Sequence, residues 1–300
     1  MGHYALPGLI DGHAHVTSGP HSERTLQCTY PDGGLAWSRS TACRRSHPAP
    51  AIAHLDTISW TQAARLGIDG LEHTLPTSAD LLETTQRASY LAERGADARY
   101  LFRWFELADF DGTLIQEMLA ELAQRRVVVS TTLGVNELAY SSDRLDSVLP
   151  PEDRAYFHPA NLDALLAFLP RMSEEDHRQA RAVMPKVLEF ARRLHVAGVP
   201  ILVGTDGNGG GPAYSRELEL HLRAGISAWD VLRLATSDAA DALGIGNRTG
   251  RIAKGMEADI AFFGSNPLGN PGSMRDVKLV LADGKAGTPE QILGTVDWAP

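Results

Sequence analysis

Two hydrophobic patterns alternate along most of the chain. Short apolar runs of strand character occur at 51–54, 68–73, 127–134 and 199–206. Segments with the apolar spacing of amphipathic helices occur at 56–67, 78–95, 110–126, 173–198, 215–225 and 227–244. This alternation predicts an α/β fold with a parallel sheet, because strand–helix–strand units return each strand in the same direction.

Local signals sharpen these boundaries. Gly67 is a predicted helix C-cap and Ser78 a predicted N-cap. Residues 138–159 contain the pair Pro150–Pro151 and are expected to form a long loop. The helix over 173–198 is expected to kink at Pro185. Residues 249–263 and 276–285 predict strands of a separate small sheet.

Side chains that bind metals follow the predicted strands. His54, His73 and Asp206 each end a strand, and His13 and His15 follow the first apolar run. In an extended segment His13 and His15 face the same side, about 6–7 Å apart. The carboxyl ends of parallel strands meet on one face, so these five groups predict a divalent-metal site. The plain alternatives are a solvated His-Ala-His turn, a buried structural histidine and an Asx turn at Asp206.

Composition narrows the classes of partner. The 300 residues suffice for one large or two smaller domains, and the net charge is −9. That charge argues against nucleic acid or an anionic membrane as partner, and a small-molecule substrate is expected instead. Two cysteines predict no disulfide framework, and the expected location is the cytoplasm.

At this point the sequence resembles the amidohydrolase superfamily of metal-dependent hydrolases, nearest its imidazolonepropionase-like and prolidase-like branch. The carrying stretches are PGLIDGHAHV, AHLDTISWTQAARLGIDGLEH, ILVGTDG, and the long segment from DVLRLATSDAADALG to IAFFGSNPL. They cover residues 1–18 and about 51–290.

The resemblance implies specific roles. His13 and His15 would bind the more buried metal, and His54 and His73 the second. Asp206 would touch the first metal and act as general base, with His73 also counted in the catalytic set. Zinc is the expected ion, as one or two atoms, and manganese or cobalt is less favoured.

The sequence departs from that family at its first third. Only 38 residues separate His15 from His54, whereas three βα units need roughly 90. We therefore expect an incomplete TIM-type (β/α) barrel over 1–245, lacking strands 2–4, with 19–50 irregular. Residues 246–300 are the expected remnant of a composite β-sandwich, whose strand within 249–263 would lack sheet partners and expose an edge.

A second departure concerns the group that would bridge two metal ions. The resemblance implies a carbamylated lysine on the fourth strand, but the first lysine of the chain is Lys186. Glu23, Cys28 or Cys43 could substitute. Alternatively, His13, His15, His54 and Asp206 hold a single metal, with His73 acting on the substrate or on a ligand.

The expected function is hydrolysis of carbon–nitrogen bonds other than peptide bonds, such as cyclic amides, by a metal-activated water. A prolidase-like dipeptidase or a lactonase would use the same site, so both stay open. A deaminase is disfavoured because Leu55-Asp56-Thr57 follows His54 without a glutamate. A catalytically impaired or inactive remnant is the alternative from another class.

Overall fold

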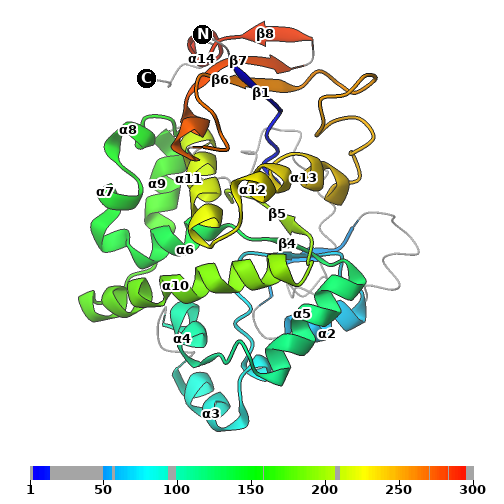
Figure 1. The fold of residues 1–300 in the computed structure, drawn as a ribbon. Coiled ribbons are helices and arrows are strands. Elements are labelled where there is room, and N and C mark those ends of the chain that lie inside the picture. The colour runs from blue at the N-terminus through cyan, green and yellow to red at the C-terminus, as the bar shows by residue number, and fades with distance from the viewer. Residues whose placement is uncertain are drawn as a thin grey trace, which may run out of the picture.

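The computed structural model has α/β architecture (Figure 1). The structure describes residues 3–13, 50–55, 58–93, 99–157, 159–206, 210–269, 271–282 and 284–294. The expected irregular segment 19–50 lies almost wholly outside them.

One sheet is parallel, as predicted, and its strands are adjacent in chain order. Its strands are β2 (Ile52–Ala53), β3 (Gly70–Glu72), β4 (Val128–Ser130) and β5 (Ile201–Leu202). Each lies within one of the predicted apolar runs but is shorter than that run. The carboxyl ends of β2–β5 therefore point the same way, as the site requires.

Helices connect and cover these strands. They are α2 (Trp60–Leu66), η2 (Ala79–Leu81), α3 (Thr84–Glu93), α4 (Tyr100–Leu107), α5 (Thr113–Arg125), α6 (Leu133–Tyr140), η3 (Ser142–Arg144), α7 (Leu145–Val148), α8 (Pro151–Arg154), α9 (Pro159–Phe168), α10 (Glu174–Val196), α11 (Gly210–Arg223), α12 (Ala228–Leu234) and α13 (Ser237–Ala242). The predicted cap at Gly67 is present, in a left-handed conformation after α2. The Ser78 side chain is also a cap, but of the short η2 and not of the long helix predicted to begin there.

Three local predictions were wrong. Residues 138–159 are not a long loop, because the end of α6 and the short elements η3, α7 and α8 occupy them. The apolar run 127–134 is a strand only to Ser130, and α6 begins at Leu133. The predicted helix over 78–95 is interrupted, because η2 ends at Leu81 and α3 begins at Thr84. The helix α10 continues through Pro185, and the kink expected there stays a prediction.

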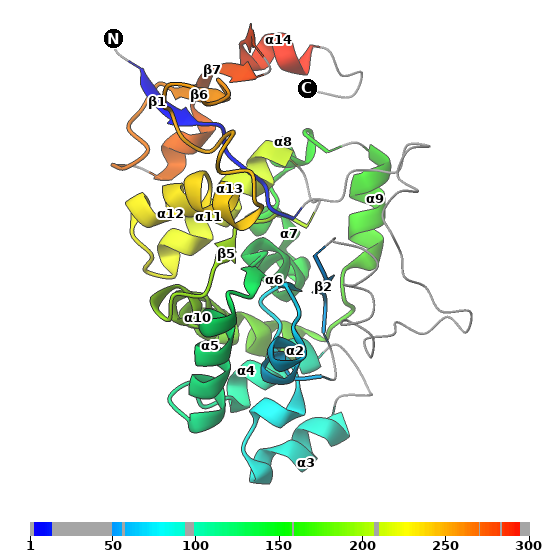
Figure 2. The same ribbon diagram turned by 90° about the vertical axis from the view of Figure 1, so that its right-hand side faces the viewer.

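A second sheet is antiparallel, in the order β1-β6-β7-β8, and lies at one end of the molecule with α14 (Pro289–Leu293) and η4 (Pro271–Arg275) (Figure 2). Its strands are β1 (Tyr4–Pro7), β6 (Ile260–Phe263), β7 (Val277–Ala282) and β8 (Lys285–Gly287). The prediction that the strand within 249–263 lacks partners was wrong, because β6 pairs with β1 on one side and β7 on the other.

An aromatic cluster fills the core where α4 packs against α10. Trp104, Phe105 and Phe190 are fully buried, and the rings of Trp104 and Phe105 meet edge to face at 5.2 Å. The Trp104 indole N–H donates to the Ser78 carbonyl at 3.0 Å, so its polar atom is satisfied. This core supports the sheet from the side of α4 and α10.

The amino terminus of α10 gives a testable stability prediction. Ser173 and Asp176 form a reciprocal capping box, and Arg99 donates to Asp176 at 2.8 Å. The Ser173 hydroxyl and Arg99 lower the pKa of Asp176 below its usual 3.8. Asp176→Asn should therefore cost about 1 kcal/mol in the free energy of unfolding at pH 7.

The pH dependence follows from the sign of that shift. A carboxyl group with a depressed pKa stabilises the fold above its unfolded-state value, and the stabilisation is lost as the pH falls through the folded-state value. Urea unfolding at pH 7 and at pH 3 should show a smaller difference between wild type and Asp176→Asn at the lower pH. An equal difference at both pH values would contradict this account.

Candidate metal centre

The segment that carries His13 lies beside β5. The Gly12 N–H donates to the Val203 carbonyl at 2.8 Å, and the Asp206 N–H donates to the His13 carbonyl at 2.7 Å. The Asp11 carboxylate accepts the Thr205 N–H at 3.1 Å and the Thr205 hydroxyl at 2.6 Å. These bonds join two segments almost 200 residues apart and place His13 next to Asp206.

His73, Thr132 and Asp206 follow β3, β4 and β5 with unusual backbone geometry. Their φ angles are 67°, 39° and 57°, and among the described non-glycine residues only Arg126 is also positive. Positive φ is uncommon outside glycine, and it is most costly for the β-branched Thr132. Such strain persists only where surrounding contacts hold it, and it is frequent at functional sites.

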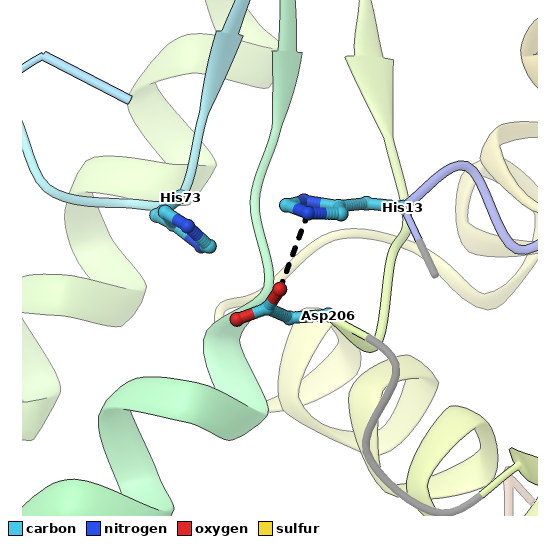
Figure 3. Close-up of side chains that lie close together, drawn as sticks. All are labelled: His13, His73 and Asp206. Carbon is cyan, nitrogen blue, oxygen red and sulfur yellow. Dashed lines mark ion pairs between the residues drawn. The ribbon is translucent and has the colours of Figure 1, made fainter. Parts of the chain in front are cut away.

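Three of the predicted ligands converge, each from a different segment (Figure 3). One ligand atom from each of His13, His73 and Asp206 lies within 4.8 Å of the others. His13 Nε2 is 3.2 Å from Asp206 Oδ1, and the rings of His13 and His73 are 5.1 Å apart. The geometry is that of a small cluster of donors at the carboxyl end of the parallel sheet.

The other two predicted ligands are His54 and His15. His54 follows β2, and its ring centre is 4.7 Å from that of His73, but its side chain is exposed and outside the three-residue cluster. His15 lies outside the described residues, as do the candidate bridging groups Glu23, Cys28 and Cys43.

Sequence reasoning gave no role to three polar residues here. Glu72 Oε2 is 2.5 Å from His13 Nδ1, and the Thr132 hydroxyl hydrogen-bonds His73 Nδ1 at 2.8 Å. The Ser130 hydroxyl is buried without a hydrogen-bond partner in the described part of the chain. The available signal was polarity, because each of the three is a polar residue within a predicted apolar run, 68–73 or 127–134.

The two histidines have opposite electrostatic settings. Burial disfavours protonation of His13, but bonds to Asp206 and Glu72 outweigh it and raise its pKa to about 10. Burial lowers the pKa of His73 to about 4, helped by the neighbouring His54 and His13 and opposed by Asp206. The cluster thus attracts one positive charge between its carboxylates and keeps the His73 imidazole neutral.

The donor set fits a divalent ion. Two imidazoles and a carboxylate are ligands that zinc accepts, and the ligand atoms of a tetrahedral zinc lie about 3.4 Å apart. The distance of 3.2 Å between His13 Nε2 and Asp206 Oδ1 fits that spacing, and the cluster limit of 4.8 Å requires side-chain movement of about an ångström for the three groups to meet one ion. Glu72 and Thr132 would each hold the second ring nitrogen of a histidine, as partners of metal-bound imidazoles generally do.

Comparisons with known proteins support the fold. Residues 152–287 match the model of the amidohydrolase family. A Xaa-Pro dipeptidase with bound methionine in its active site is 17% identical, with 82% of this chain and 47% of that chain covered and a TM-score of 0.53. A bottromycin amidohydrolase is 21% identical, with 84% and 52% covered and a TM-score of 0.58. A further amidohydrolase is 19% identical, with 82% and 46% covered and a TM-score of 0.51.

The family-model match confirms the resemblance to the amidohydrolase superfamily over residues 152–287. The chain spans about half the length of these solved structures. At such low identities the likeness concerns the α/β fold. No curated protein matches the chain. Among the described residues, no helix combines the length and apolar composition needed to cross a bilayer.

Proposed function

We propose that this protein is a divalent-metal-dependent hydrolase of the amidohydrolase type. The observation that carries the proposal is the convergence of His13, His73 and Asp206 from three separate segments at the carboxyl ends of parallel strands. Active sites of (β/α) barrels are built at that face. The family match supports the same conclusion.

The residues have distinct roles in this proposal. His13, His73 and Asp206 hold the ion, and His54 and His15 are the further candidate ligands. A bound divalent ion supplies acidified water and polarises the scissile carbonyl group. The Asp206 carboxylate accepts the proton of the attacking water and passes it to the leaving nitrogen. Glu72 fixes the orientation of His13 through Nδ1, so that Nε2 faces Asp206.

The finer assignments are part of the proposal. The ion is zinc, because the donors are imidazole and carboxylate. The sheet β2–β5 corresponds to the last four strands of an incomplete TIM-type barrel over 1–245, except that Tyr4–Pro7 pairs in the small sheet. The sheet within 246–300 corresponds to a β-sandwich remnant. The substrate is a small molecule, and the location is the cytoplasm.

The proposed reaction is hydrolysis of a carbon–nitrogen bond outside ordinary peptides, such as a cyclic amide. A prolidase-like dipeptidase is the second candidate, because a similar fold carries that activity in the Xaa-Pro dipeptidase. Lactone hydrolysis uses the same chemistry and is the third. An inactive remnant is the outcome if the site binds no metal.

Metal analysis tests the proposal directly. Protein stripped with a chelator and reconstituted with Zn²⁺, Mn²⁺ or Co²⁺ should retain at least one equivalent after desalting. It should then hydrolyse members of a panel of cyclic amides, N-acyl amino acids, Xaa-Pro dipeptides and lactones, and chelator should abolish that activity. His73→Ala should lower metal affinity at least tenfold because it removes one of three converging ligands.

His195→Ala is the matched control, because His195 lies on α10, outside the three-residue cluster, with its Nε2 3.8 Å from Asp230. It should bind metal as wild type does. Less than about a tenth of an equivalent of metal in wild type, with no chelator-sensitive hydrolysis, would support the remnant instead.

A further inference from the structure

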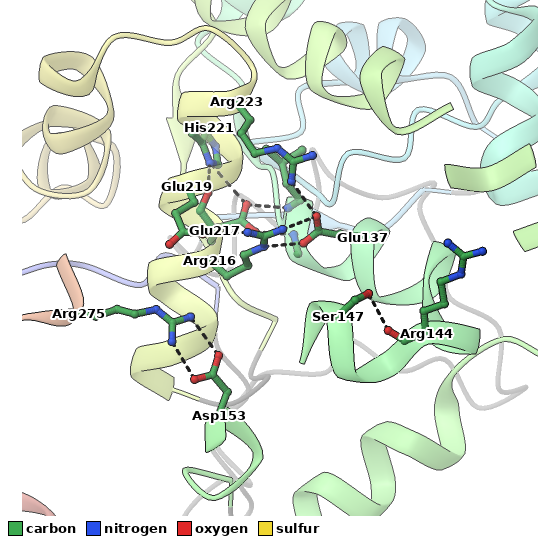
Figure 4. Close-up of polar contacts among 12 residues, drawn as sticks. Glu137, Arg144, Ser147, Asp153, Arg216, Glu217, Glu219, His221, Arg223 and Arg275 are labelled. Carbon is green, nitrogen blue, oxygen red and sulfur yellow. Dashed lines mark hydrogen bonds and ion pairs between the residues drawn. The ribbon is translucent and has the colours of Figure 1, made fainter. Parts of the chain in front are cut away.

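Helix α11 presents two buried polar side chains that the proposed mechanism does not use. Glu217 and His221 lie one helical turn apart, with 1% and 0% of the residue exposed. Both face the segment 131–134, which joins β4 to α6 (Figure 4). Burying a carboxyl group and an imidazole is costly unless their hydrogen bonds are satisfied.

Glu217 takes the place of a helix cap. Its two carboxylate oxygens accept the N–H groups of Leu133 and Gly134, each at 2.6 Å. These are first-turn N–H groups of α6, which have no partner within the helix. The N-cap residue Thr132 makes no side-chain capping bond, because its hydroxyl is bonded to His73 instead.

His221 fixes the preceding residue. Burial lowers its pKa to about 4, so the ring is neutral near pH 7 and has one donor and one acceptor. Nδ1 lies 2.8 Å from the Glu217 carbonyl and must donate, so Nε2 accepts from the Thr131 hydroxyl at 2.9 Å. From the opposite side the Thr74 hydroxyl donates to the Thr131 carbonyl at 2.5 Å.

These contacts hold Thr132 in its strained conformation. Thr132 has a φ of 39° and is fully buried between the residues that Glu217 and His221 bind. Its hydroxyl lies 2.8 Å from His73 Nδ1 and can accept that proton. With Nδ1 engaged, Nε2 is the nitrogen left for an ion.

We propose that Glu217 is a positioning residue for the metal ligand His73, acting through the 131–134 segment and the Thr132 hydroxyl. The inference rests on the proposed metal-dependent function and deepens it. Glu217 stands 144 residues from His73 in sequence and acts on it only through Thr132. Releasing the Leu133 and Gly134 N–H groups lets the segment relax from positive φ, which moves the hydroxyl and frees the His73 ring to turn.

The electrostatics of Glu217 support this assignment. Burial raises its pKa to about 8, opposed by the N–H groups of Gly134 and Leu133. Burying such a group costs stability, and the bonds from the Leu133 and Gly134 N–H groups offset part of that cost. Buried acidic groups with strongly shifted pKa values are found most often at functional sites.

The test measures Co²⁺ binding to metal-free protein by its visible absorption, which reports the geometry of the ligands. Glu217→Gln preserves shape but can accept only one of the two N–H groups. It should weaken Co²⁺ binding about tenfold and change the spectrum. Glu219→Gln is the matched control, since Glu219 is on the same helix and pairs with Arg216 at 2.9 Å. Its Kd should stay within about twofold of wild type.

Two further variants keep the test decisive. Glu217→Asp retains the carboxyl group but is too short to reach both N–H groups. It replaces Glu217→Gln if circular dichroism shows that variant unfolded. Thr132→Val removes the hydroxyl and should weaken Co²⁺ binding as Glu217→Gln does. Thr132→Ser keeps the hydroxyl and should retain the wild-type Co²⁺ affinity.

Each outcome has one meaning. Folded Glu217 variants with wild-type Kd and spectrum would overturn the inference while leaving the metal site intact. A wild-type Kd in Thr132→Val would overturn the route through the hydroxyl. Wild-type protein that binds no Co²⁺ would instead refute the proposed function, and this inference with it.

Discussion

Asp206→Asn is expected to lower kcat by about 10²–10⁴ while the protein still binds part of its metal. In the proposed site both imidazoles bind the ion through one ring nitrogen and are hydrogen-bonded through the other, so the Asp206 carboxylate is the group of this cluster that can take a proton from water. The amide of asparagine is not basic, but its oxygen can remain a weak ligand. Steady-state kinetics on the reconstituted enzyme, together with elemental analysis, separate loss of the base from loss of the ion.

A second aspartate controls for the change of charge. Asp111 is 84% exposed and pairs with Arg193 far from the site in sequence. Asp111→Asn should keep both kcat and metal content. Full activity in Asp206→Asn would contradict the role of Asp206 as the base and would direct attention to Glu72, the other carboxylate beside His13.

The strand ends of the site were predictable because the signal for them is local. An apolar run that ends at a histidine or aspartate predicts a buried strand whose end lies at the polar edge of a sheet. The runs ending at His54, His73 and Asp206 therefore predicted the parallel strands β2, β3 and β5. The caps at Gly67 and Ser78 were predictable for the same reason, since a cap is determined by one or two residues.

Contacts between distant segments were not predictable. β1 has only four residues, and it pairs with β6 at positions more than 250 residues away in the sequence. No local periodicity predicts this pairing. Glu217 reads as one more acidic residue on an amphipathic helix. Its partners, the N–H groups of Leu133 and Gly134, become visible only when α11 lies against α6.

The end of β4 shows how tertiary context overrides a local pattern. Residues 127–134 are β-branched and apolar and favour a strand throughout. The chain instead turns at Thr132 through a positive φ and starts α6, because Glu217 supplies the cap and His73 takes the hydroxyl. The helix α4, which was not predicted, forms for a similar reason, since its Phe102, Trp104 and Phe105 are buried in the aromatic core.

Gly204→Ala is expected to disrupt the proposed metal site, because the added methyl group would collide with the backbone of the His13 segment. An added Cβ at Gly204 would lie 2.5 Å from His13 Cβ, 2.9 Å from His13 N and 3.0 Å from Ser130 Oγ. Backbone atoms cannot swing aside as a long side chain can, so the His13 segment must move. A displacement of about 1 Å exceeds the tolerance of roughly 0.5 Å for a preorganised site. We expect the Co²⁺ Kd to rise at least tenfold.

Gly211→Ala separates this effect from a general consequence of replacing glycine. An added Cβ at Gly211 would meet no atom within 4 Å, and the residue lies in α11. It should bind Co²⁺ like wild type and unfold at the same urea concentration or a higher one, because alanine favours helix. Wild-type affinity in a folded Gly204→Ala protein would mean that His13 need not lie against β5 to hold the ion. The close approach of two segments almost 200 residues apart would then not be what builds the site.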